Sequence, residues 1–377
     1  NQTTIMKGMS LNLLPVIGLT FVMICGHIDL SIGTSLTLGG MLTIGLQPHL
    51  GWPIAILVAV SAGLVVGIIN GWLVAKLKID SFIVTLGTMI ITQGLVYIYG
   101  HGGVLTVNDF RLGNWLEQPL LPLLAPRVII AVALGLIFNF MLVRSCVGRG
   151  FFLVGGNPAA ARNAGLPVAR YLIGAFALSG MLACLGGALF SASLSSAMPT
   201  MGNNSLMEVI TAVIIGGTAM TGGRVKIWRI RIALLALAML YNGLELMGAG
   251  WEMRKLATGL VLGSVILYEA VGERRERLRR GLRHELLEEL AHEKLIPSAK
   301  LMDKTRVEDE SGFESEIEST EPNENPTMKR NENNPVLIVC ITALACVAMV
   351  AIVAMYLLHQ PANLPGAPNG ITTSQAA

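Results

Sequence analysis

Charged side chains are scarce in this sequence: Asp, Glu, Lys and Arg make up only 14% of its 377 residues, while hydrophobic residues make up 53%. A soluble globular domain carries about 25% charged residues. The mean hydropathy of +0.63 agrees with this shortage. The composition excludes an ordinary soluble domain. It indicates a protein that crosses the lipid bilayer several times, since each span needs about 20 mostly apolar residues.

Signatures of catalysis and metal binding are also missing. The sequence contains no GxxxxGK[ST] phosphate loop, no HExxH pair and no GxSxG turn. Without a phosphate loop the chain cannot itself cradle the phosphates of ATP. Its five cysteines form no CxxC pair and are expected to be free thiols. We therefore predict a protein that is not an enzyme, binds no cofactor or metal, and has no nucleic-acid partner.

Apolar runs of helical length predict ten membrane spans. Only helices and closed barrels satisfy the backbone in lipid, and these runs are too long and too continuously apolar for barrel strands. The sequence thus predicts an all-α polytopic membrane protein. The expected spans are 10–25, 31–48, 53–75, 81–99, 127–144, 170–192, 207–223, 231–249, 253–271 and 335–358.

Alternate loops between these spans differ in their content of Lys and Arg. Residues 144–170 and 224–231 are rich in arginine, whereas residues 48–53 and 193–206 contain neither Lys nor Arg. Because cytoplasmic loops carry the excess of positive charge, the basic loops should be cytoplasmic. Nine spans before the tail then place Asn1 outside, and we expect that a first span is missing from this sequence.

The composition of the sequence changes after the ninth predicted span. Residues 273–334 are charged and combine an amphipathic helix with an acidic linker that lacks apolar periodicity and is predicted to be disordered. This amphipathic helix either packs against the membrane surface or its own protein, or binds a partner. The predicted organisation is a membrane domain in 1–272, this cytoplasmic segment, an extra span in 335–358 and an extracytoplasmic disordered tail in 359–377.

The stretch "GHIDLSIG" (26–33) places an aspartate inside a long apolar run. An Asp at the centre of a span costs about 2.5–3.5 kcal/mol on insertion scales. We therefore predict a break between two short spans, permitted by Gly26 and Gly33, with Asp29 or Ser31 capping the second helix. Direct contact of Asp29 with a substrate is the alternative. A proton relay would need a second ionisable group, which the sequence does not supply nearby.

Two further stretches could carry function. In "GGNPAAARNAG" (155–165), Asn157 is a helix cap, Pro158 occupies the first helical position and Gly165 ends the turn, which predicts a short helix outside the membrane. That helix is either an ordinary loop helix or a docking helix for a soluble partner. "VIIGGTAMTGGR" (213–224) is loosely similar to residues 26–33, through an old duplication or by chance.

Polar side chains inside the predicted spans are expected to join helices by hydrogen bonds. Glu245 is the ionisable one, and an intramembrane carboxylate is a functional-site hypothesis. Its place near the outer end of its span also allows it to reach water. The set comprises Asn70, Thr85, Thr88, Gln93, Asn139, Asn242 and Glu245.

Several of these stretches together resemble the ribose-type permeases of ABC importers, within the branched-chain amino acid/ribose permease superfamily. "GLTFVMICGHIDLSIG" (18–33) is similar to the family's G-x-T-x-V-x-x-x-x-G-I-D-L-S-V-G signature, and "SFIVTLGTM" (81–89) to its A-F-I-A-T-L-G segment. The glycine-rich stretches 155–165 and 213–224, with "SLSSAMPTMG" and "NGLELMG", also match family segments. The resemblance covers about residues 1–272 in order.

The resemblance implies a type II ABC importer-like membrane domain in a bacterial plasma (inner) membrane. It implies three partners: a separate ATPase that docks on the 147–170 loop and holds the ATP and magnesium, a second permease copy or sister permease, and an extracytoplasmic binding protein. The substrate would be a ribose-like monosaccharide, or autoinducer-2, or another small polar solute. The family fold also supplies the first span that is missing here.

The resemblance also assigns roles to individual residues. The ATPase-coupling loop comprises Gly155, Gly156, Asn157, Ala160, Ala161 and Gly165. The helix-junction motif comprises Gly26, Asp29, Leu30, Ser31 and Gly33. The glycine-rich motif comprises Gly216, Gly217, Thr218, Gly222 and Gly223. Asn242 and Glu245 are candidates for the translocation path.

The sequence departs from the family pattern in places. His27 and Val225 replace usual glycines, Arg229 and Arg231 stand where small residues usually open a span, and the tail from 272 has no family counterpart. The tail suggests an added regulatory or anchoring module. Two other functions remain open: a secondary transporter or channel that works alone, and a degenerate permease that serves as a membrane scaffold or sensor.

Overall fold

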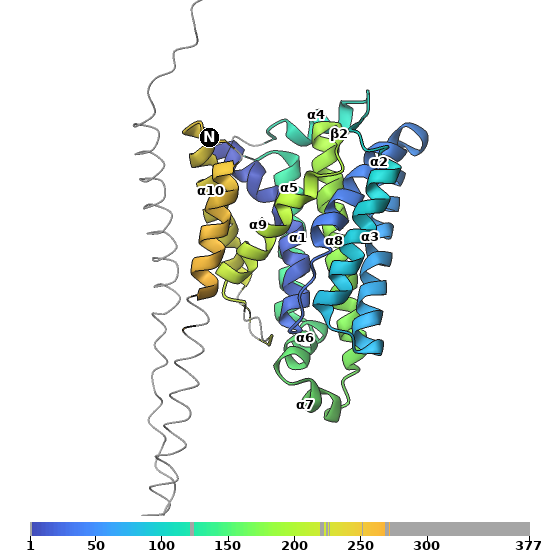
Figure 1. Cartoon of the computed structure of the whole chain (residues 1–377), viewed down its shortest axis with the longest axis vertical. Helices are drawn as coiled ribbons and strands as arrows, with labels where there is room; N and C mark the ends of the chain where they lie inside the picture. The colour runs from blue at the N-terminus through green and yellow to red at the C-terminus, as the bar shows by residue number, and fades with distance from the viewer. Residues whose placement is uncertain are drawn as a thin grey trace, which may run out of the picture. The chain divides into compact units, whose positions relative to one another are not determined.

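The computed structural model describes residues 2–120, 124–218, 222–223, 225, 227–250, 252–267 and 271. The named helices, from Gln2 to Leu246, all belong to one compact unit (Figure 1). The predicted segments 273–334, 335–358 and 359–377 lie outside the described residues.

The described part of the chain is almost entirely helical, as the sequence predicted. Its helices are α1 Gln2–Ile24, α2 Ile32–Leu77, α3 Ser81–Tyr99, α4 Arg111–Glu117, α5 Pro126–Arg144, α6 Cys146–Gly156, α7 Pro158–Asn163, α8 Val168–Leu194, α9 Met201–Ile215 and α10 Ile227–Leu246. Residues 252–267 are helical as well. The short strands β1 Leu105–Thr106 and β2 Ser196–Ala197 pair antiparallel, with Leu105 opposite Ala197.

Five of the described helices are long and apolar enough to cross a membrane: α1, α2, α3, α5 and α8. Helix α2 has 46 residues and bends at Gly51, where φ is 74°. The predicted spans 31–48 and 53–75 therefore meet at a sharp bend between Pro48 and Pro53, without a separate loop. The positive φ explains why glycine occupies the bend.

The predicted span 207–223 is wrong in its bounds. Helix α9 has 15 residues and ends at Ile215, so it is about 22 Å long at a rise of about 1.5 Å per residue. The chain leaves the helix because Gly217, Gly222 and Gly223 all have positive φ. Helix α10 begins at Ile227 and the helical residues 252–267 follow it, so two further predicted spans, 231–249 and 253–271, correspond to helices with shifted ends.

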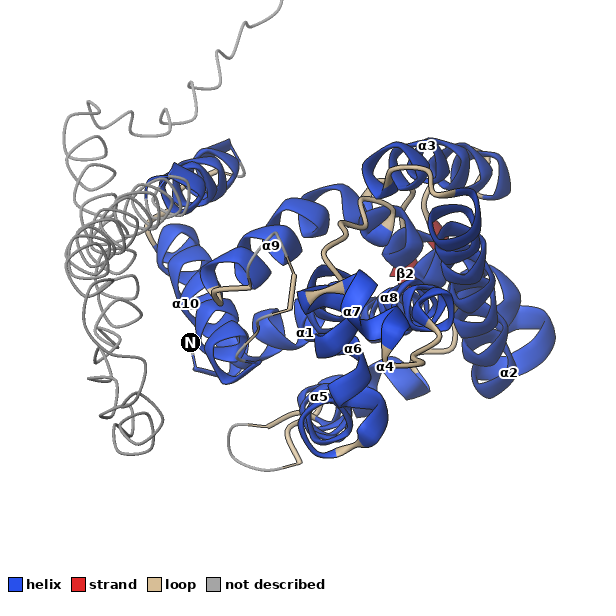
Figure 2. Cartoon of the chain, turned by 90° about the horizontal axis from the view of Figure 1, so that it is seen from below, coloured by secondary structure: helices blue, strands red, loops and turns tan. Residues whose placement is uncertain are grey.

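Helix α8 lies between α1 and α2 in the core (Figure 2). Small residues allow the backbones to approach: a Cβ added to Gly63 would lie 2.4 Å from the carbonyl oxygen of Gly180, and one added to Gly67 2.2 Å from that of Phe176. Such contacts are typical of helix packing in lipid. The outer faces of α3 and α5 instead expose large apolar side chains such as Ile91.

Candidate functional site

The helix junction around Asp29 contains several buried polar side chains. Helix α1 ends at Ile24 and α2 begins at Ile32, so the predicted break is confirmed, and Gly26 within it has a φ of 79°. Asp29 is buried. One of its carboxylate oxygens accepts hydrogen bonds from the backbone N–H (3.0 Å) and the hydroxyl (2.6 Å) of Ser31.

The other carboxylate oxygen of Asp29 accepts a hydrogen bond from the hydroxyl of Ser179 on α8, at 2.7 Å. Both groups are buried. Ser31 directly precedes α2, and its side chain makes no capping bond. At the start of this helix, the carboxylate of Asp29 instead accepts the backbone N–H of Ser31. In the described residues the hydrogen-bond partners of Asp29 are hydroxyl and backbone groups, which supply no second member for a proton relay.

The junction is also tied to the second half of α2 and to α3. The hydroxyl of Ser31 accepts a hydrogen bond from the amide nitrogen of Asn70 (3.0 Å), and the amide oxygen of Asn70 accepts one from Thr88 (2.6 Å). The backbone N–H of Leu30 donates to the hydroxyl of Thr85 at 3.1 Å. The prediction that polar side chains join the helices is confirmed for Asn70, Thr85 and Thr88.

His27 takes no part in these bonds. Burial lowers the pKa of His27 below its ordinary value, and the charge of Asp80 offsets this only in part. Its ring lies 6.3 Å from that of Phe176, centroid to centroid. His27 is therefore a partly buried residue of the helix junction with a neutral imidazole.

The predicted short helix after Asn157 is present as α7. The side chain of Asn157 accepts a hydrogen bond from the backbone N–H of Ala160 at 3.0 Å, Pro158 occupies the first turn, and Gly165 follows with a φ of 82°. Only Ala161 of this helix is buried. Helix α7 lies at the opposite end of the unit from the N-terminus (Figure 1).

The preceding helix α6 was not predicted. Its residues were expected to belong to a cytoplasmic loop between two predicted spans. Phe151 nevertheless anchors the helix, since its buried ring lies 5.3 Å from that of Phe21 and 5.2 Å from that of Tyr171. Helix α7 therefore follows directly from a packed helix rather than from a free loop.

The structure brings three of the predicted motifs together. The backbone N–H of Gly223 donates to the carbonyl oxygen of Ile24 at 2.8 Å. Gly155 lies against the same carbonyl, and Gly222 lies against Gly26. Thr218 is buried and its hydroxyl has no hydrogen-bond partner in the described residues. Gly216 lies instead against Ile230 of α10.

Asn242 and Glu245 are not joined to Asp29 by any described hydrogen bond or ion pair. The side chain of Glu245 is exposed, and its carboxylate lies 3.5 Å from the guanidinium of Arg254. This fits a carboxylate that reaches water. The place of Asn242 and Glu245 on a translocation path stays a prediction.

Two charged side chains with partners in the fold, Glu208 and Glu117, were not predicted from the sequence. Glu208 on α9 is half-buried and accepts a hydrogen bond from Asn12 of α1 at 2.6 Å. Glu117 lies 2.6 Å from Lys7 and 2.9 Å from the buried Arg127. For Glu208 the sequence did contain a signal, since its carboxylate stands inside the apolar run "LMEVITAV". Glu117 and Lys7 lie more than a hundred positions apart in the sequence, so no local pattern predicts their ion pair.

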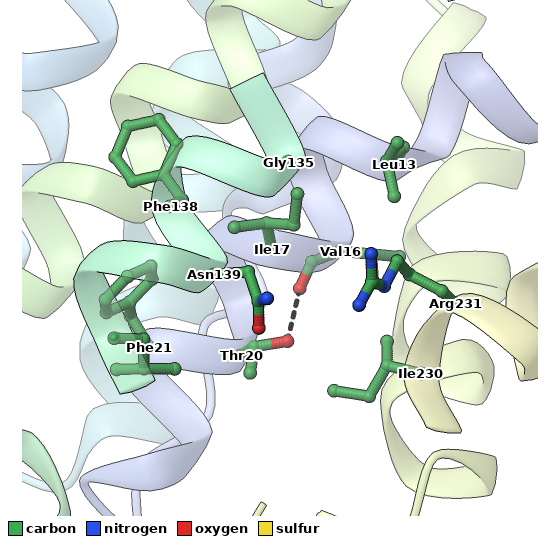
Figure 3. A pocket seen from close by; sticks show the side chains of 11 residues that line it. Leu13, Val16, Ile17, Thr20, Phe21, Gly135, Phe138, Asn139, Ile230 and Arg231 are labelled. Atoms are coloured by element: carbon green, nitrogen blue, oxygen red, sulfur yellow. Dashed lines mark hydrogen bonds between the residues drawn. The ribbon is translucent and has the colours of Figure 1, made fainter. Parts of the chain in front are cut away.

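A pocket lies between α1, α5 and α10 (Figure 3). Most of its lining is aliphatic or aromatic, with Thr20, Asn139 and Arg231 as its polar members. The hydroxyl of Thr20 is already engaged with the carbonyl of Val16 at 2.7 Å. A sugar site needs several convergent polar groups, so this pocket fits one poorly. The described residues contain no group of ligands suited to a metal ion.

Comparison with known proteins agrees with these features. The family described as "Branched-chain amino acid transport system / permease component" matches residues 3–268. The ribose import permease protein RbsC of Bacillus subtilis is 33% identical over 281 residues, which cover 71% of this chain and 84% of the relative. RbsC of Escherichia coli K12 is 32% identical over 278 residues, 71% of this chain and 85% of the relative.

The L-arabinose transport system permease protein AraH of Escherichia coli K12 is 31% identical over 293 residues, 72% of this chain and 84% of the relative. No solved structure matches the chain. In this family the membrane component binds no cofactor, and ATP binds to a partner ATPase. The chain therefore belongs to the branched-chain amino acid transport system permease family and is a multi-pass permease component of a bacterial ABC importer, without catalytic activity of its own.

Proposed function

We propose that the chain translocates a monosaccharide, with a ribose-like sugar as the first candidate. The relatives that support this are named for the import of two different sugars, ribose and arabinose. Identities of 31–33% do not distinguish between related substrates. Autoinducer-2 or another small polar solute is the alternative cargo of the same machinery.

The exposure of α7 is the observation that carries the proposed mechanism. Pro158, Ala159 and Ala160 are exposed, and their small side chains leave the helix backbone open to close approach. Arg162 in the last turn and Arg170 after it place this end among the basic loops expected in the cytoplasm. In the proposal the partner ATPase docks here on the exposed residues Gly156, Asn157, Ala160 and Gly165, while the buried Gly155 and Ala161 pack this segment against the rest of the chain.

The proposal assigns the remaining partners to other surfaces. The extracytoplasmic binding protein would deliver the solute at the end that carries α4, β1 and β2, opposite α7 (Figure 1). A second permease copy or a sister permease would complete the path. Asn242 and Glu245 on α10 would offer an amide and a carboxylate to sugar hydroxyls, the hydrogen-bonding groups that such a solute requires.

The proposed membrane domain is of the type II importer kind. Its nine spans in this sequence would be α1, the two halves of α2, α3, α5, α8, α9, α10 and the helix at 252–267. Residues 335–358 would add one further span, and residues 273–334 would lie in the cytoplasm as an accessory segment.

Affinity purification of the full chain from mild detergent, with bound subunits identified by mass, tests the proposal. We expect a stoichiometric ATPase that carries a phosphate loop. Ala160→Trp should abolish its recovery, because the added indole occupies the exposed face of α7 without touching the core. Gly94→Ala is the matched control, since its new methyl group meets no atom within 4 Å. Recovery of the wild-type chain alone would contradict the proposal.

That contrary result would favour the two other functions. A degenerate permease acting as a scaffold or sensor would bind neither an ATPase nor a solute-loaded binding protein. A solitary secondary transporter would instead move solute along an ion gradient in liposomes that contain only this chain. The hydroxyl and backbone partners of Asp29 disfavour the latter, since they provide no ionisable relay.

A further inference from the structure

Three segments of the chain meet backbone to backbone beside α7. They are the C-terminal end of α1 with Ile24 and Gly26, the C-terminal end of α6 with Gly155 and Gly156, and the pair Gly222 and Gly223 after α9. All of them are described and belong to one compact unit. We name this meeting point the glycine joint.

A hydrogen bond at the end of α1 holds the joint together. The last carbonyl groups of a helix have no partner within the helix. The carbonyl of Ile24 is one of these, and the backbone N–H of Gly223 donates to it at 2.8 Å. The joint therefore satisfies a helix end with the backbone of another segment, independently of any side chain.

The joint leaves no space for a side chain at Gly155, Gly222 or Gly223. A Cβ on Gly155 would lie 1.7 Å from the carbonyl oxygen of Ile24, whereas ordinary contacts begin at 3.4 Å. A Cβ on Gly222 would lie 2.7 Å from the nitrogen of Gly26. Gly222 and Gly223 also have φ angles of 81° and 74°, which favour glycine. Glycine is thus required both for close approach and for conformation.

The joint stands between two functional segments. On one side, Gly156 is the last residue of α6 and is followed at once by Asn157, the cap of α7. On the other side, Ile24 leads within five residues to Asp29, whose hydrogen bonds reach α8 through Ser179. Side-chain contacts can absorb a displacement by changing rotamer, but direct backbone contacts in a close-packed interior cannot do so.

We propose that the glycine joint transmits displacement of α7 to the junction between α1 and α2, and that Gly155, Gly222 and Gly223 are positioning residues for transport. This inference rests on the proposed function, in which α7 receives the ATPase. ATP-driven movement of α7 would shift the end of α1 through the joint. The Asp29 network would carry this shift to α2, α3 and α8.

Hydrogen exchange in the wild-type complex tests the inference without substitutions. The chain would be purified with its ATPase and compared with and without a non-hydrolysable ATP analogue. We expect the analogue to change exchange together in peptides that cover 157–165, 24–30 and 222–223. A change at 157–165 without any change at 24–30 and 222–223 would overturn the joint alone. No change at 157–165 would contradict the proposed docking on α7, and the inference with it.

Transport measured per ATP hydrolysed supplies a second test. Gly222→Ala should bind the ATPase and support hydrolysis, yet move at least tenfold less solute per ATP, because the new methyl group separates the loop from Gly26. Gly174→Ala on α8 is the control, since its nearest new contact is an ordinary 3.9 Å to Phe151. An unchanged ratio in folded Gly222→Ala would overturn the inference. If that variant does not fold, the exchange experiment decides.

Discussion

Removal of the Ser179 hydroxyl should destabilise the membrane domain far more than its size suggests. The hydroxyl donates to the Asp29 carboxylate at 2.7 Å, and both groups are buried. A hydrogen bond to a charged group contributes about 1.5–3 kcal/mol, and a buried carboxylate oxygen left without its donor loses it fully. We therefore expect Ser179→Ala to lower the free energy of unfolding by about 2–3 kcal/mol.

Ser61→Ala is the matched control for this substitution. Ser61 is exposed on α2, and its hydroxyl donates only to the carbonyl of Leu57 in the same helix, at 2.8 Å. Its removal should change stability by less than about 0.5 kcal/mol. Reversible unfolding in mixed detergent micelles, followed by circular dichroism, measures both variants.

A double-mutant cycle separates the hydrogen bond from other effects of the substitution. Asp29→Ala removes both acceptor oxygens, so the cycle with Ser179→Ala should give a coupling energy of about 1–2 kcal/mol, within the range for residues in contact. Equal destabilisation by Ser179→Ala and Ser61→Ala would refute the reasoning. A coupling energy near zero would also do so.

Three further predictions concern a cap and two ion pairs. Asn157→Ala should remove the cap of α7, which contributes about 1 kcal/mol, and weaken recovery of the ATPase, whereas Asn157→Ser should restore it. Arg127→Met should destabilise the chain by about 1.5–3 kcal/mol, because it removes the 2.9 Å charge-assisted contact with Glu117, whose carboxylate keeps only its pair with Lys7 at 2.6 Å. Arg254→Met should change the same unfolding free energy by less than about 1 kcal/mol, because its pair with Glu245 is exposed; similar effects of the two arginine variants would contradict this comparison.

Local sequence signals predicted most of the helices. Apolar runs placed α3, α5 and α8 close to their observed ends and predicted the end of α1, but they placed its start at residue 10 rather than at Gln2. Asn157 with Pro158 placed the start of α7. The ends of these helices are determined by residues close together in the sequence, so they can be predicted from a single sequence. The end of α9 was missed because the residues after Ile215 are apolar enough to continue a helix, while their glycines adopt positive φ instead.

Long-range partners could not be predicted in the same way. Asp29 was expected to cap a helix, but its bond to Ser179 joins residues 150 positions apart. The motifs around Gly26, Gly155 and Gly223 were recognised separately, and only the fold shows that their backbones touch. Helix α6 was missed because its stability comes from aromatic packing between Phe151 and Phe21, not from helix propensity.

ATP-dependent uptake is the most direct test of the proposed transport function. The full chain would be reconstituted into liposomes with its co-purified ATPase and the extracytoplasmic binding protein, and labelled ribose and arabinose would be supplied outside. The account predicts sugar accumulation that requires ATP on the ATPase side and is lost in Ala160→Trp but not in Gly94→Ala. Accumulation by the chain alone, driven by an ion gradient and indifferent to ATP, would contradict it.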